Sequence, residues 1–177
     1  HTRTAESVKA FVQITRYPFQ SLGRDVIGEG LRGAGGQRPA NDIWGLTGAE
    51  YAKVADPWPL NPDGELILGL KIEDRHCLAN VDDIAAVPGI AFAEWGPGDM
   101  GMSFMDPDAH DPPYPEVMND ARDQIKTALD KNGIGFYSSW ADDDMTMEQR
   151  VDYSLDVLGV KIMGATKEWA EYGLSLI

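Results

Sequence analysis

The sequence contains a single cysteine, Cys77, among its 177 residues. One cysteine cannot form an intramolecular disulfide, and this fits a reducing compartment such as the cytoplasm. No apolar run approaches the roughly 20 residues needed to cross a bilayer, and no charged start followed by an apolar stretch marks a signal peptide. These absences predict a soluble, cytoplasmic protein with no membrane partner.

Basic residues are also scarce. The chain has 15 Lys and Arg against 29 Asp and Glu, so its formal net charge is -14. The acidic residues are spread along the chain rather than gathered in one block, and such a surface repels phosphate backbones. Nucleic acid is therefore excluded as an expected partner.

The length predicts one domain, residues 1–177, because 177 residues can bury one core. A strand, helix, strand unit stands near its centre. The segments 66–72 and 90–95 are short, evenly apolar runs typical of strands buried on both faces. Between them, Asn80 or Asp82 can cap one short helix that Pro88 ends, which predicts a right-handed crossover between parallel strands.

Two carboxylates follow these strands directly. Glu73 comes after the first strand and Asp99 after the second, so both are expected at the same edge of a parallel sheet. Ligands of parallel α/β proteins gather at that edge. Two carboxylates there suit a hard divalent cation that keeps positions open for water and substrate. The alternative is that both acids are solvated loop residues.

The motifs resemble those of a known family. KIED at 71–74, followed about two dozen residues later by WGPGDMGMS at 95–103, is similar to the metal-binding core of the HpcH/HpaI aldolase and citrate lyase β-subunit family. RYPF at 16–19 resembles a segment of its pyruvate-dependent aldolases, and YPEV at 114–117 follows the metal loop. The resemblance covers essentially the whole chain.

The resemblance implies a site. It makes Glu73 and Asp99 the ligands of Mg²⁺ or Mn²⁺, with Co²⁺ as a further candidate, and makes pyruvate or another 2-oxo acid the metal's substrate. Four residues are expected to line the substrate site: Lys71, Gly96, Pro97 and Gly98. The glycines would let backbone N–H groups approach the substrate carboxylate closely.

The resemblance also implies a fold, a partial (β/α)8 barrel of the α/β class that lacks the family's first strands. A complete barrel usually takes about 250 residues, and this chain begins at His1 in what reads as a helix entry. The open sheet edge predicts a homo-oligomer. The family's catalytic arginine and histidine come from the early strands and have no counterpart here. His76 and His110 do not match, so the catalytic residues stay unknown.

The implied function is a metal-dependent carbon–carbon lyase, a class II aldolase that forms or cleaves 4-hydroxy-2-oxo acids through a pyruvate enolate. An aldehyde is the second partner, and the sequence does not identify it. Two alternatives stay open. One is a citrate-lyase-like lyase of coenzyme A esters, and the other is a catalytically incomplete fragment or assembly subunit.

The remaining elements follow from periodicity and capping. Helices are expected at 4–14, 46–54, 116–131, 145–158 and from 166, and strands at 134–140, 160–163 and, weakly, near Val26. The acidic run 142–144 is expected to cap the fourth helix. The glycine-rich segment 28–36 is interpreted as part of a flexible loop, and 106–115 as a solvated loop rather than a second metal site.

Two charged residues depart from the family pattern, which usually has glutamine at Lys71 and an apolar aromatic residue at Glu94. Both are expected to face the barrel interior, where an unpaired charge is costly. We therefore predict that they form a buried ion pair beneath the metal. The alternative, Lys71 as a Schiff-base nucleophile, requires a depressed pKa, which the nearby carboxylates oppose.

Overall fold

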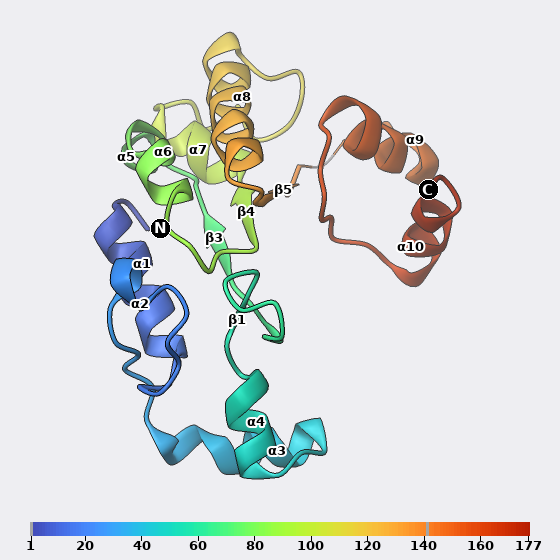
Figure 1. The fold of residues 1–177 in the computed structure, drawn as a ribbon. Helices are drawn as coiled ribbons and strands as arrows, with labels where there is room; N and C mark the ends of the chain where they lie inside the picture. Colours follow the sequence, from blue (N-terminus) through green and yellow to red (C-terminus); the bar gives the residue numbers. More distant parts are fainter. Residues whose placement is uncertain (1, 141) are drawn as a thin grey trace.

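The centre of the molecule is a parallel sheet with the strand order β3-β4-β5 (Figure 1). The computed structural model describes residues 2–140 and 142–177. Its central strands are β3 (Gly69–Lys71), β4 (Phe92–Trp95) and β5 (Gly135–Ser138). Both pairings are parallel, as the predicted crossover requires. The sequence therefore predicted correctly that the two strands of the crossover are parallel neighbours.

The predicted strand 66–72 is divided in two. Its first part, β2 (Leu66–Ile67), pairs with β1 (Pro57–Trp58), whereas its second part, β3, pairs with β4. The pairing partner changes at Leu68, whose carbonyl oxygen accepts a hydrogen bond from the N–H group of Ala91. The described residues thus form a two-stranded and a three-stranded sheet rather than one continuous sheet.

The crossover contains two short helices instead of one. These are α5 (Arg75–Ala79) and α6 (Val81–Ala85), which are separated at Asn80. Asp74 caps α5, because its carboxylate accepts hydrogen bonds from the N–H groups of His76 and Cys77. Asn80 precedes α6 without a side-chain cap bond, so the predicted capping by Asn80 or Asp82 was wrong.

The helix α8 (Glu116–Lys131) has the predicted bounds. Its buried side chains recur at helical spacing and include Ala121, Ile125 and Leu129. Val117, expected in the same stripe, is exposed, and Met118 is buried in its place. The helix packs against α6 and the strands β4 and β5, so it covers one face of the central sheet.

The N-terminal part is more helical than expected. Helix α1 (Ala5–Thr15) begins after its predicted cap, Thr4. Helix α2 (Arg24–Ile27) occupies the position where a strand near Val26 was predicted. The segment interpreted as a flexible glycine-rich loop continues into a 3-10 turn, η1 (Ala34–Gly36), and helix α3 (Gln37–Trp44). Helix α4 (Gly48–Val54) lies within the predicted range 46–54.

The C-terminal part keeps its helices but not its strand. Helix α9 (Met147–Asp152) continues as a π-helical turn, η2 (Tyr153–Val157), and α10 (Lys167–Leu174) follows the cap residue Thr166. Thr146 caps α9 through a capping box with Gln149, so the predicted acidic cap was wrong.

The predicted strand 160–163 is reduced to one parallel bridge between Tyr137 and Ile162. Figure 1 shows that α9 and α10 lie to one side of the central sheet, while α3 and α4 lie beyond its lower end.

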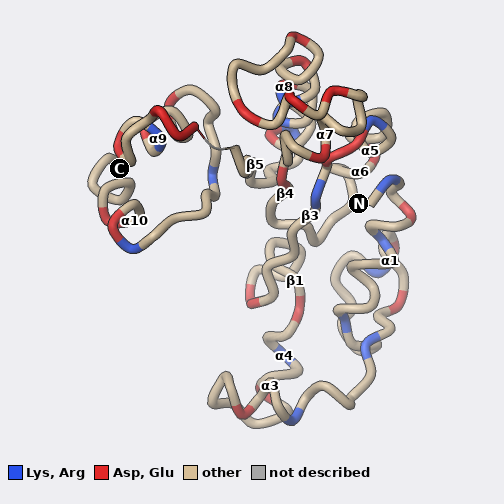
Figure 2. The backbone as a smooth tube through the Cα atoms, turned by 180° about the vertical axis from the view of Figure 1, so that it is seen from behind, with Lys and Arg blue, Asp and Glu red and all other residues tan. Residues whose placement is uncertain are grey.

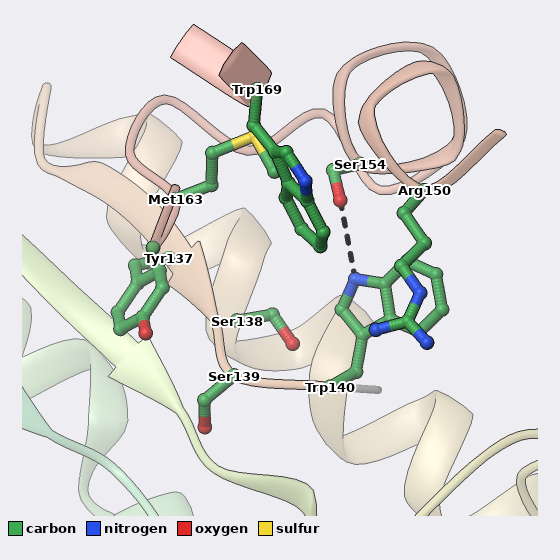
Figure 3. Close-up of a pocket in the computed structure, with 9 residues that line it drawn as sticks. Tyr137, Ser138, Ser139, Trp140, Arg150, Ser154, Met163 and Trp169 are labelled. Carbon is green, nitrogen blue, oxygen red and sulfur yellow. Dashed lines mark hydrogen bonds between the residues drawn. The ribbon is translucent and has the colours of Figure 1, made fainter. Parts of the chain in front are cut away.

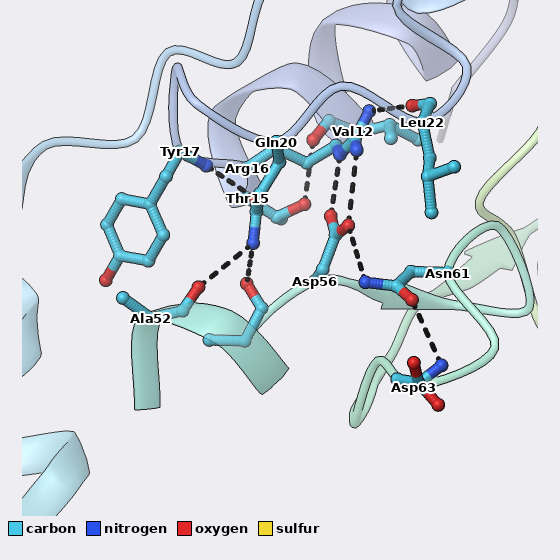
Figure 4. Close-up of polar contacts among 11 residues, drawn as sticks. Val12, Thr15, Arg16, Tyr17, Gln20, Leu22, Ala52, Asp56, Asn61 and Asp63 are labelled. Carbon is cyan, nitrogen blue, oxygen red and sulfur yellow. Dashed lines mark hydrogen bonds and ion pairs between the residues drawn. The ribbon is translucent and has the colours of Figure 1, made fainter. Parts of the chain in front are cut away.

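A buried ion pair joins the end of α1 to the start of β1 (Figure 4). Arg16 is 1% exposed, and its Nε atom lies 2.6 Å from Oδ1 of Asp56. Its Nη1 atom donates to the carbonyl oxygen of Leu22 at 2.6 Å, and Asn61 donates to Asp56 Oδ2 at 3.1 Å. These bonds compensate both charges for lost hydration.

Acidic residues occur along the whole chain rather than on one element (Figure 2). Across residues 2–140 and 142–177, no helix is both long and apolar enough to span a membrane.

Candidate metal and substrate site

Glu73 and Asp99 lie at the same edge of the central sheet, as predicted. Glu73 follows β3, and Asp99 stands in the first turn of helix α7 (Pro97–Ser103), which follows β4. Both residues line a cavity of about 320 Å³, and both also line a second cavity of about 340 Å³ on the side of His76. The first cavity is lined by Lys71, Glu73, Gly96, Gly98, Asp99, Met102, Pro107, His110 and Ser139.

The Glu73 side chain packs closely against the backbone of Gly96. It is 2% exposed, and a Cβ atom on Gly96 would collide with its Oε1 atom. Only glycine allows this close approach. Burial raises the pKa of the Glu73 carboxyl group, and the hydrogen bond from Lys71 opposes part of that rise. A bound cation would favour the ionised form of this carboxylate.

Lys71 forms ion pairs with two acidic residues, Glu73 and Glu94. Its Nζ atom lies 3.7 Å from Oε2 of Glu94, its register partner on β4, and 2.9 Å from Oε1 of Glu73. The predicted pair with Glu94 therefore forms. The expectation that it would be buried was wrong, because the Lys71 side chain is 56% exposed on a sheet face that the described strands leave open.

The charge state of Lys71 does not favour a Schiff base. The hydrogen bond with Glu73 raises the pKa of Lys71, and the negative charges of Glu73, Glu94 and Asp99 act in the same direction, although burial opposes them. A nucleophilic amine needs the opposite shift. Lys71 therefore serves better as a cation that partly neutralises the two carboxylates.

The start of α7 holds the other predicted residues, with Gly96 at the N-cap and Pro97 and Gly98 in the first turn. Pro97 is buried at the first position of the helix, and the cavity lining includes Gly96 and Gly98 but not Pro97. N–H groups in the first turn of a helix have no carbonyl partner within the helix, so those near Gly98 and Asp99 suit a carboxylate ligand.

Two further polar residues reach this cavity, of which sequence analysis set His110 aside and did not consider Ser139. His110 comes from the segment 106–115, interpreted as a solvated loop, and its ring packs against Gly98. Ser139 follows β5. No local pattern marks either residue, since a loop histidine and a strand-end serine are common in any sequence. Only the folded chain brings them to the carboxylates.

The residues present fit a divalent cation through two carboxylate ligands. Between residues 2–140 and 142–177, no group of three or more His, Cys, Asp or Glu side chains is arranged to hold a metal ion. Glu73 and Asp99 provide hard oxygen donors at one cavity. Mg²⁺ is commonly held by one or two carboxylates and keeps several waters or substrate oxygens, so this donor set matches its chemistry.

We expect Lys71→Gln to strengthen metal binding by about 3- to 10-fold, because it removes a partly solvent-screened ammonium group that repels a cation. That ammonium lies 2.9 Å from Glu73 Oε1. Calorimetric titration with Mn²⁺ measures the effect. Lys131→Gln, at an exposed position at the end of α8, is the control and should bind as the unmodified protein does. Equal or weaker binding by Lys71→Gln would contradict this electrostatic account.

A further cavity of about 240 Å³, which shares Ser139 with the cavity of about 320 Å³, lies between β5 and the C-terminal helices (Figure 3). Its walls include the rings of Trp140 and Trp169 together with Arg150, and Trp140 donates a hydrogen bond to Ser154 Oγ at 3.3 Å. None of the residues predicted for the metal or the substrate lines this cavity. The candidate site is therefore the cavity at Glu73 and Asp99.

The fold and this cavity define a parallel α/β protein whose candidate site lies at the carboxyl ends of its strands. The sequence model of the family described as HpcH/HpaI aldolase/citrate lyase matches residues 1–157. The chain belongs to this family of aldolases and lyases, which confirms the resemblance seen in its motifs.

Individual relatives support the assignment. The chain is 31% identical over 101 residues to a hydroxypyruvate/pyruvate aldolase of Deinococcus radiodurans, a match that spans 57% of this chain and 30% of that protein.

Two solved structures share the fold. An HpcH/HpaI family protein of Burkholderia cenocepacia J2315 matches 98% of this chain and 60% of its own length, with a TM-score of 0.67 and 17% identity. An HpcH/HpaI aldolase of Desulfitobacterium hafniense DCB-2 matches 98% of this chain and 58% of its own, with a TM-score of 0.65 and 19% identity. The chain spans less than two thirds of the length of these relatives.

Proposed function

We propose that this chain carries the metal site of a class II aldolase, which forms or cleaves 4-hydroxy-2-oxo acids through the enolate of pyruvate. The observation that carries the proposal is the pair of carboxylates, Glu73 and Asp99, at neighbouring strand ends around one cavity. Membership of an aldolase and lyase family supports it, as does the similarity to a hydroxypyruvate/pyruvate aldolase.

We propose further that the chain is the later part of a (β/α)8 barrel that lacks the first strands. The fold similarity to longer family members supports this, because they match nearly the whole chain over about three fifths of their own length. The open inner face beside Lys71 is where further strands, or a second copy of the chain, would pack.

In this proposal Glu73 and Asp99 hold the cation, which is Mg²⁺ or Mn²⁺, with Co²⁺ as a further candidate. When bound, the cation supplies electrostatic stabilisation of the negative charge that develops on the enolate oxygen. Gly96 leaves room for Glu73, the backbone at Gly98 receives the substrate carboxylate, and Lys71 limits the local negative charge.

The cleavage reaction requires the removal of one proton and the addition of another. In the cleavage direction, a proton leaves the 4-hydroxyl group, the bond between C3 and C4 breaks to give the aldehyde and the enolate, and C3 then takes up a proton to give pyruvate. Condensation reverses these steps. The family's arginine and histidine have no counterpart in this sequence, so only metal and substrate binding are proposed for the predicted residues.

The test is release of pyruvate from 4-hydroxy-2-oxopentanoate, followed with a coupled lactate dehydrogenase assay. We expect EDTA to abolish the release and added Mg²⁺ or Mn²⁺ to restore it. Release that is insensitive to EDTA would contradict the metal site. Cleavage of a coenzyme A ester in place of the oxo acid would identify the lyase alternative, and no cleavage of either substrate would favour an incomplete or structural subunit.

A further inference from the structure

The cavity of about 240 Å³ beside β5 has two tryptophan walls (Figure 3). Trp140 follows β5 and Trp169 belongs to α10, so segments far apart in the sequence form the walls. Met163 adds a further apolar side chain. We call this space the tryptophan cavity. An apolar cavity of about 150 Å³ can hold benzene, so the tryptophan cavity has room for one substituted aromatic ring.

The Trp140 wall is held in place by the protein itself. Its Nε1–H group donates a hydrogen bond to Ser154 Oγ at 3.3 Å, and its ring packs edge-on against Tyr153 with 4.7 Å between the centroids. Tyr153 and Ser154 belong to η2, the π-helical turn. Such turns are rare and frequently occur at functional sites. Here the irregular turn positions one wall of a cavity.

The Trp169 wall carries a positive charge. Arg150, which also lines the tryptophan cavity, has its Cζ atom 5.9 Å from the centroid of the Trp169 ring. The two helices are joined further along, where the Tyr172 hydroxyl donates to Asp152 Oδ1 at 2.9 Å. Of the described residues that line this cavity, Arg150 alone carries a charge. The electrostatics therefore favour an anionic ligand over a cationic one.

The ion pair that Arg150 forms is a weak one. Its Nη2 atom lies 3.1 Å from Oδ1 of Asp143, whose side chain is fully exposed, whereas that of Arg150 is 21% exposed. A pair with a fully solvated carboxylate contributes little free energy. A ligand carboxylate inside the cavity would meet the same guanidinium in a less hydrated place, where its planar N–H groups suit a carboxylate.

A buried hydroxyl group supplies a second polar partner. Ser138 lines the tryptophan cavity and is 6% exposed, and within residues 2–140 and 142–177 its Oγ atom has no hydrogen-bond partner. Figure 3 shows this hydroxyl on the side of Trp140. A buried hydroxyl without a partner costs free energy, and a ligand oxygen would remove that cost.

We propose that the tryptophan cavity binds a small aromatic carboxylate. The ring lies against the indoles of Trp140 and Trp169, and the carboxylate binds Arg150, with the Ser138 hydroxyl as a second polar partner. Binding is non-covalent and consumes nothing. The inference goes beyond the proposed aldolase function and does not rest on it, because direct binding is measured without turnover.

The test is calorimetric titration with benzoate, benzamide and cyclohexanecarboxylate. Benzamide keeps the ring but has no charge, and cyclohexanecarboxylate keeps the charge but has no aromatic face. We expect a Kd for benzoate of about 0.1–1 mM, which is reasonable for so small a ligand. Each of the other two should bind about 5- to 10-fold more weakly, because it loses one of the two interactions.

Two variants separate these interactions. Arg150→Gln should weaken benzoate binding by about 10-fold and leave benzamide binding unchanged. Trp169→Leu should weaken benzoate binding by about 5-fold and leave cyclohexanecarboxylate nearly unchanged. The control is Arg122→Gln in α8, a matched arginine whose side chain is 17% exposed and pairs with the exposed Asp123 outside this cavity. It should bind benzoate as the unmodified protein does.

A second readout needs no variant. The chain has five tryptophans, and benzoate should shift the indole N–H signals of Trp140 and Trp169 in NMR spectra of the unmodified protein, but not those of the other three. Unshifted signals of Trp140 and Trp169 at about ten times the expected Kd would overturn the inference. Equal affinity for benzoate and benzamide, or an equal effect of Arg122→Gln and Arg150→Gln, would also overturn it. None of these results would bear on the aldolase proposal.

Discussion

Under the proposed function, replacing Glu73 with glutamine is expected to reduce metal-dependent pyruvate release by about 100-fold or more, because it removes one of the two proposed protein ligands of the cation. Glutamine keeps the shape of the side chain, so its close packing against Gly96 should be preserved. Calorimetric titration with Mn²⁺ and the pyruvate assay measure the two consequences. Both should be impaired together.

The control is Glu65→Gln, an exposed acid just before β2 that lies outside the cavity lining.

The burial that raises the pKa of Glu73 also predicts how metal affinity depends on pH. Metal affinity should fall as the pH is lowered, because the proton competes with the cation for this carboxylate. Glu73→Gln with unimpaired activity would exclude Glu73 as a ligand.

Replacing Arg16 with methionine is expected to lower the free energy of unfolding by about 3–5 kcal/mol, since it leaves the Asp56 carboxylate buried without its charge partner. Both side chains of this pair are almost fully buried, and Nε lies 2.6 Å from Oδ1. Urea denaturation followed by circular dichroism measures the loss. The pair joins α1 to β1, so its removal should loosen the N-terminal part of the molecule.

A double variant, Arg16→Met with Asp56→Leu, separates the pair's net contribution from the cost of an orphaned charge. It should recover much of the lost stability, because two apolar groups of similar size often replace a buried ion pair at little cost. Arg24→Met, at a partly exposed arginine in α2, should change stability by less than about 1 kcal/mol. A double variant no more stable than Arg16→Met alone would argue against the orphaned-charge explanation.

The sequence pattern was sufficient to predict the central strand–helix–strand unit. Two buried apolar runs joined by a helical connection are typical of a parallel crossover, so the pattern predicted that Glu73 and Asp99 share one edge. The alternation of side chains along a strand likewise predicted that Lys71 and Glu94 face the same side, where they contact each other. Periodicity was enough for α8 because one face of that helix is continuously apolar.

Strand pairing, burial and the shortest helices depend on residues far apart in the sequence, so only the tertiary structure shows them. The strand 66–72 is divided because its two parts find different partners, β1 and β4. Lys71 is exposed because burial depends on the strands that cover it, not on its own position. Likewise, helix α2 formed where propensity weakly favoured a strand, since secondary structure in short segments is set by packing.

The sequence by itself determined the family, the strand-end carboxylates and their shared edge, because these follow from motifs and from the geometry of one contiguous unit. Only the folded chain placed His110 against Gly98 and Ser139 in the same cavity. Loops and strand ends carry no periodic signal, and their positions depend on contacts between residues far apart in the sequence.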